Sequence, residues 1–103
     1  MRLLEPKEIV LNGTRYILSK FPAVAGREII YGYEILANQK SQEYQFHESM
    51  MFKLMKYVGK VIEGREPLLL ETRELIDNHV KDWATLVKLE QEALIYNKNN
   101  DVF

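Results

Sequence analysis

The chain has 103 residues, of which 47% are hydrophobic and 28% are charged. This composition is typical of one folded domain and too apolar for a disordered chain. The formal net charge of −1 argues against a nucleic-acid-binding surface, which needs clustered positive charge. The absence of cysteine excludes a disulfide framework and thiolate chemistry.

The N-terminal stretch MRLLEPKEIV is too acidic, and its apolar run too short, for a signal peptide. A membrane-spanning helix needs about 18 consecutive apolar residues, and no stretch of this sequence approaches that length. We therefore expect a soluble cytoplasmic protein that is not secreted and has no membrane partner.

Two strand-like runs flank Asn12-Gly13. The dipeptide Asn-Gly is a strong hairpin signal because both positions tolerate positive φ. The sequence therefore predicts a β-hairpin over 7–19, with packing residues among Ile9, Leu11, Tyr16 and Leu18. Because a lone hairpin is marginally stable in water, we expect it to lie against helices.

Pro22 suits the first turn of a helix, where its missing N–H is no loss, and the helical pattern then runs to about Asn38. Steps of 100° per residue place an apolar set on one face of this helix: Gly26, Ile29, Ile30, Tyr33, Leu36 and Ala37. Val24, Tyr31 and Ile35 fall together on roughly the opposite face. Two apolar stripes indicate that the helix is covered on both sides, by its own fold or by a partner.

The remaining pattern predicts a second helix over 43–62, with Phe52 off its apolar sector, and a short buried connector at 68–70. Thr72 is a candidate N-cap for a short helix that runs to about Val80. Asp82 is a candidate N-cap for a last helix that ends near Tyr96, and Asn97 suits the position at the C-terminal end of that helix. The sequence thus predicts a mainly α fold of about three to four helices behind the N-terminal hairpin. Residues 1–97 would form one globular domain, helical over 22–96, and 98–103 a disordered tail.

Catalytic and metal-binding patterns are missing from the sequence. His47 and His79 are the two histidines, without the spacing of a metal site, and we interpret both as partly buried or surface residues. The glycines follow neither phosphate-loop pattern, and no serine lies in a nucleophile elbow. We therefore expect no enzyme activity and no cofactor.

The last predicted helix carries a carboxylate within its apolar face. Trp83, Leu86, Val87, Ala93 and Leu94 share that face, and Glu90 falls among them. A fully buried lone carboxylate is costly, so we expect Glu90 to have an Arg, Lys or Tyr partner or to lie near a rim.

The stripe on the first helix bears most on partners. Large exposed apolar patches usually mark interaction sites, so the candidate partner-binding residues are Val24, Tyr31 and Ile35, with Phe52 elsewhere. The alternative is that the first helix is central in the fold, which would make the stripe part of the core.

The order of motifs resembles the tail assembly chaperones of long-tailed bacteriophages. A hairpin containing NGTRYIL leads into KFPAVAGREII, followed by HESMMFKLMKYV and by PLLLETRELIDNHVKDWATLVKLEQEALIYN. In that family a short β element precedes a Phe-Pro-Ala-like helix start, and the chain closes on a helix ending in Tyr-Asn. The resemblance covers roughly residues 9–97, whereas the end NKNNDVF departs from the aromatic, glycine-containing finish of several relatives.

The resemblance implies a non-enzymatic role. Tail assembly chaperones coat the long, aggregation-prone tape measure protein, keep it soluble, and give way as tail tube protein polymerises around it. Many exist in two forms, the longer made by ribosomal frameshifting, and this chain would be the short form. Self-association is also implied, and the host cytoplasm would be the location.

A different class of function fits the same surfaces. A small phage-encoded regulatory or inhibitory protein could bind one host protein stoichiometrically through similar apolar and acidic surfaces. A long helical-protein gene directly downstream, with an overlapping reading frame, would favour the chaperone. An isolated early-expressed gene would favour the inhibitor.

Overall fold

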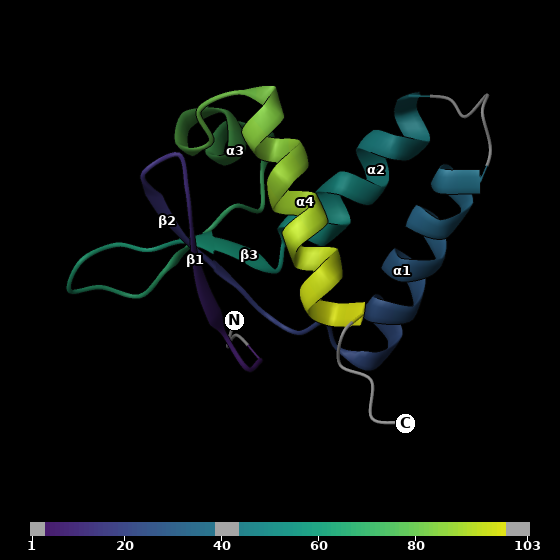
Figure 1. Cartoon of the computed structure of the whole chain (residues 1–103), viewed down its shortest axis with the longest axis horizontal. Coiled ribbons are helices and arrows are strands. Elements are labelled where there is room, and N and C mark those ends of the chain that lie inside the picture. The colour runs from purple at the N-terminus through teal and green to yellow at the C-terminus, as the bar shows by residue number, and fades with distance from the viewer. Residues whose placement is uncertain (1–3, 39–43, 99–103) are drawn as a thin grey trace.

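The computed structural model describes residues 4–38 and 44–98, which form a helical layer beside an antiparallel sheet (Figure 1). The helices are α1 (Ala23–Asn38), α2 (Tyr44–Met55), α3 (Arg73–His79) and α4 (Trp83–Lys98). The strands are β1 (Lys7–Leu11), β2 (Thr14–Leu18), β3 (Val58–Lys60) and β4 (Leu68–Leu69), and they pair in the order β1-β2-β3-β4. No helix in the described ranges is long and apolar enough to cross a membrane.

The hairpin predicted at Asn12-Gly13 is present in the structure. Both turn residues have positive φ, 50° and 79°, and Leu11 pairs with Thr14 across the turn. Alternation along β2 directs Tyr16 and Leu18 into the core, where both are buried.

The predicted mainly α class is wrong, because the sheet continues beyond the hairpin and the fold is α+β. The second helix ends at Met55 and does not reach Ile62; Val58–Lys60 instead pairs antiparallel with β2, and the 68–70 connector supplies β4. The physical reason is the open edge of β2, whose backbone groups need partners. Val61 N–H donates to Arg15 C=O at 3.0 Å, and Leu70 N–H to Val58 C=O at 2.9 Å.

A glycine suits β3 because the chain is crowded there. A Cβ at Gly59 would lie 3.1 Å from a methyl carbon of Ile17 and 3.2 Å from Cβ of Pro67. The β-branched residues around Gly59 favour a strand, although the same residues also match a helical apolar sector.

Both predicted N-caps are confirmed. The Thr72 hydroxyl accepts a hydrogen bond from Leu75 N–H at 3.2 Å, and Asp82 Oδ1 accepts one from Thr85 N–H at 2.8 Å. These bonds satisfy backbone donors at the starts of α3 and α4. Hydrogen bonds from Thr85 hold the pKa of the Asp82 carboxyl below its usual range.

One core joins the sheet to the helices. Its fully buried side chains come from β2, α1, α2, β3, α4 and the residue after β4: Tyr16, Leu18, Ile29, Leu54, Met55, Val58, Leu70 and Leu89. Figure 1 shows α2 and α4 between the sheet and α1. The first helix therefore packs on two helices and keeps a side turned away from the sheet.

The contact between α1 and α2 depends on a glycine. Gly32 is buried against Met50, and a Cβ added at this position would overlap the Met50 sulfur. The two helices approach closely at this point because position 32 has no side chain.

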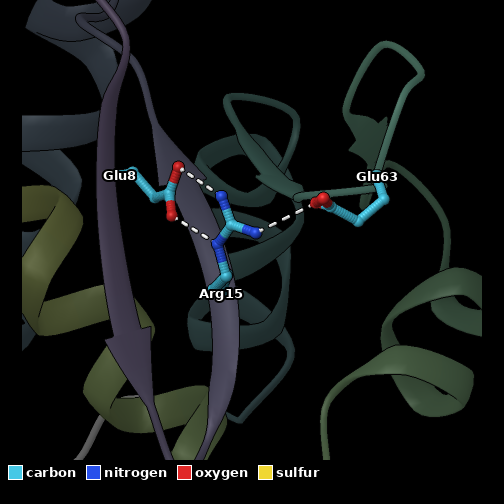
Figure 2. Close-up of polar contacts among 3 residues, drawn as sticks. All are labelled: Glu8, Arg15 and Glu63. Carbon is cyan, nitrogen blue, oxygen red and sulfur yellow. Dashed lines mark hydrogen bonds and ion pairs between the residues drawn. The ribbon is translucent and has the colours of Figure 1, made fainter.

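The outer face of the sheet carries charged residues. Figure 2 shows Arg15 between Glu8 of the same hairpin and Glu63 of the loop after β3. The Arg15 guanidinium lies 2.6 Å from Glu8 and 3.4 Å from Glu63, and all three side chains are exposed to solvent. Exposed pairs contribute little to stability, so we interpret this network as a hydrated surface.

Candidate functional site

The stripe predicted on the first helix lies partly in solvent. Val24 is 84% exposed and Tyr31 is 67% exposed, so these two side chains are not core residues. Ile35 is half-buried. We call Val24, Tyr31 and Ile35 the α1 face.

Phe52 does not join the α1 face. It is half-buried against the core on α2, and the Arg73 guanidinium of α3 lies 5.3 Å from its ring centroid. Figure 1 shows α1 and α3 at opposite sides of the molecule. The structure therefore places the fourth predicted residue in the contact between α2 and α3.

A groove of about 900 Å³ adjoins the α1 face, and Tyr31 belongs to both. We call it the α1 groove; it is lined by Leu4, Glu5, Lys20, Phe21, Pro22, Ala23, Gly26, Arg27, Ile30, Tyr31, Glu34, Asn97 and Lys98. A salt bridge of 2.9 Å from Lys98 of α4 to Glu34 of α1 lies among these lining residues. Apolar side chains with charged residues between them suit a partner segment that is itself amphipathic.

Two short motifs that carry the sequence resemblance, Phe-Pro-Ala at the start of α1 and Tyr-Asn near the end of α4, meet beside this groove. Phe21 N–H donates to Asn97 Oδ1 at 2.8 Å, and Asn97 Nδ2 donates to Ser19 C=O at 3.2 Å. Lys20 Nζ donates to Tyr96 C=O at 2.6 Å and lies over the Tyr96 ring. These bonds tie the end of α4 to the start of α1.

The role of Asn97 therefore differs from the predicted one. We expected Asn97 to follow the last helix, whereas α4 continues to Lys98 and the Asn97 side chain bridges two segments. Helical periodicity carries no information about this bridge, because its partners lie 76 to 78 positions away in the sequence. The tail predicted over 98–103 falls, beyond Lys98, outside the described residues.

Glu90 has one of the expected partners. It is 7% exposed on α4, and the Tyr33 hydroxyl of α1 donates to its Oε1 at 2.5 Å. His47 Nε2 of α2 lies 3.9 Å from the same oxygen, and its ring meets that of Tyr33 edge to face. Glu90 thus connects the three helices.

Burial is the largest cause of the pKa shifts of Glu90 and Tyr33. Desolvation raises the pKa of the Glu90 carboxyl above its ordinary value of 4.5, although the Tyr33 hydrogen bond and the nearby His47 partly offset it. The same burial, with the adjacent carboxylate, raises the pKa of Tyr33. Tyr33 therefore stays a neutral donor.

These shifts predict a pH dependence of stability. Because folded Glu90 keeps its proton at a pH where unfolded Glu90 has lost it, its contribution to the free energy of unfolding should fall as pH rises from about 4.5 through the folded-state pKa. Glu90→Gln should remove this decline, since the amide oxygen can still accept from Tyr33. Urea unfolding midpoints between pH 4.5 and 7.5 measure the effect.

The matched control for this prediction is Glu92→Gln, which removes a carboxylate from the same helix. It should keep the decline seen in the unmodified chain. A decline that persists in Glu90→Gln would contradict the assignment to Glu90.

Trp83 departs from the expected core face of the last helix. It is 79% exposed, and Val87 on the next turn is also exposed. Together with Tyr44, which is 73% exposed at the start of α2, Trp83 lines a smaller groove between α2 and α4. The sequence indicated the direction of Trp83 on its helix and not its exposure.

Neither histidine lies in a recognisable metal site. In residues 4–38 and 44–98, no group of three His, Asp or Glu side chains could hold a metal ion. His79 Nδ1 lies 3.4 Å from Lys60 Nζ, and the His79 carbonyl accepts from the Tyr16 hydroxyl at 3.1 Å.

Comparisons with protein-family models, with characterised proteins and with solved structures gave no match to this chain. The resemblance to tail assembly chaperones therefore rests on its sequence motifs alone.

Proposed function

We propose that this chain is a tail assembly chaperone of a long-tailed bacteriophage, in its short form. In this role it binds the tape measure protein in the host cytoplasm and keeps it soluble, without enzymatic activity. The exposed α1 face beside the α1 groove is the observation that carries the proposal. Exposed large apolar side chains that gather next to a groove are typical of protein interaction sites.

The proposed mode of binding is a helix laid into a groove. An amphipathic stretch of the tape measure protein would place its apolar side on Tyr31, Ile30 and Phe21, with its polar side toward Arg27 and Glu34. Each contact is weak, since one buried apolar side chain contributes about 1.5–3 kcal/mol before the losses of association are subtracted. Many copies along one tape measure protein would supply avidity.

Reversibility follows from the same arrangement. Weak individual contacts would let tail tube protein displace the chaperone one copy at a time as the tube polymerises. Self-association of neighbouring copies would strengthen the coat in the meantime.

Co-expression tests the proposal. A phage tape measure protein should be soluble when it is produced together with this chain and should precipitate when it is produced alone. Stoichiometric co-purification with one host protein, and no effect on tape measure solubility, would contradict the proposal and favour an inhibitor.

A further inference from the structure

A second groove lies between α2 and α4, and it shares no lining residue with the α1 groove. We call it the α2–α4 groove; it is lined by Tyr44, His47, Glu48, Met51, Trp83, Leu86, Val87 and Glu90. Its volume is about 200 Å³. Pockets for drug-sized ligands are about 300–1,000 Å³, so this groove has room for one long side chain.

Two aromatic rings and two carboxylates determine the chemistry of this groove. Tyr44 comes from α2 and Trp83 from α4, and their rings are the most exposed side chains of the lining. Glu90 and Glu48 supply carboxylates, and of these Glu48 already pairs with Arg73 of α3 at 2.6 Å. Aromatic faces together with a carboxylate attract a cation.

Of the two carboxylates, Glu90 is the one that remains to pair with a cation, because Glu48 is already paired with Arg73. Tyr33 donates to its Oε1, and His47 is the nearest cationic candidate at 3.9 Å. Within the described residues no lysine or arginine forms an ion pair with Glu90. Burial raises the pKa of this carboxyl, so a cation placed against it would stabilise its charged form.

We propose that the α2–α4 groove binds the guanidinium group of an arginine side chain from a partner polypeptide, stacked against Trp83 and Tyr44 and paired with Glu90. Arginine fits better than lysine, because the planar guanidinium stacks on aromatic rings and is more weakly hydrated than an ammonium group. An uncharged occupant would favour the neutral, protonated form of buried Glu90, whereas a guanidinium group would pair with its carboxylate.

Trp83 makes the proposal directly measurable, since it is the single tryptophan of the chain. N-acetyl-arginine methylamide is the probe, and the matching citrulline derivative has nearly the same shape without the charge. Saturable changes in Trp83 emission are expected at millimolar arginine derivative, with at least about tenfold weaker binding of the citrulline derivative. NMR shifts of the Met51 methyl group give a second readout inside the groove.

Two variants separate the carboxylate from the rest of the groove. Glu90→Gln should weaken binding of the arginine derivative by about tenfold or more, because it keeps the acceptor for Tyr33 and removes the charge. Glu92→Gln, on the same helix and outside the groove lining, should bind as the unmodified chain does. Far-UV circular dichroism verifies that both variants are folded.

Several results would overturn the proposal. Equal binding of the arginine and citrulline derivatives would show that the groove takes an uncharged side chain. Equal affinity of Glu90→Gln and the unmodified chain would remove Glu90 from the site. No saturable response of Trp83 and Met51 would show that the groove does not bind guanidinium.

Discussion

Replacing both Val24 and Tyr31 with glutamate should abolish solubilisation of the tape measure protein while leaving the fold intact. Both side chains are largely exposed, and surface substitutions of this kind usually change stability by less than about 0.5 kcal/mol. Glutamate at position 24 also lies in the first turn of α1, where a negative charge favours the helix.

The loss of binding has two physical components. The partner would lose about 1.5–3 kcal/mol for each apolar side chain removed from the contact. It would also have to desolvate two carboxylates without a matching cation, which is unfavourable in a closed interface. In the proposed mode of binding many copies line one partner, so the defect at each copy would be multiplied along the length of that partner.

Val10→Glu is the matched control. Val10 is 61% exposed on β1, so the substitution makes the same chemical change on the sheet. This variant should still solubilise the tape measure protein. Equal solubilisation by the unmodified chain, the double variant and Val10→Glu would exclude the α1 face as the binding site. An unfolded double variant would show that the α1 face is needed for folding.

Gly32→Val should destabilise the fold by about 1–3 kcal/mol, because the new side chain must displace Met50 between α1 and α2. Domains of this size are stable by about 5–15 kcal/mol, so the loss is a substantial share. Helix propensity works in the other direction, since valine is a better helix former than glycine. Urea unfolding followed by circular dichroism measures the change.

Two further variants separate the steric overlap with Met50 from the effect of helix propensity. Ala37→Val places the same side chain at an exposed position of α1 and should cost only about 0.5 kcal/mol. Combining Gly32→Val with Met50→Ala should cost less than the sum of the single changes, because the valine fills part of the space that Met50 leaves. Strict additivity would contradict the close contact between the two helices.

Local signals were enough for several elements. The Asn12-Gly13 turn, the start of α1 after Pro22, and the caps Thr72 and Asp82 each act within a few residues, so the sequence could predict them. The same reasoning placed Val24 and Tyr31 on one side of α1.

Long-range contacts explain what the sequence could not predict. Val58–Lys60 matches both a helix and a strand, and the choice depends on the free edge of β2, about 40 residues earlier. A helical wheel gave the direction of Trp83 but not how far a neighbouring element covers it. The sequence predicted that Glu90 has an Arg, Lys or Tyr partner or lies near a rim. It could not predict that this partner is Tyr33, because that contact depends on how α1 packs on α4.

Site-specific photocrosslinking can show whether the tape measure protein lies on the α1 face. Benzoylphenylalanine would replace Tyr31 in one protein and Val10 in another, and each would be irradiated with the co-expressed tape measure protein. If the partner binds at the α1 face, we expect a crosslink to the tape measure protein from position 31 and none from position 10. A crosslink from position 10 with none from position 31 would contradict binding at the α1 face.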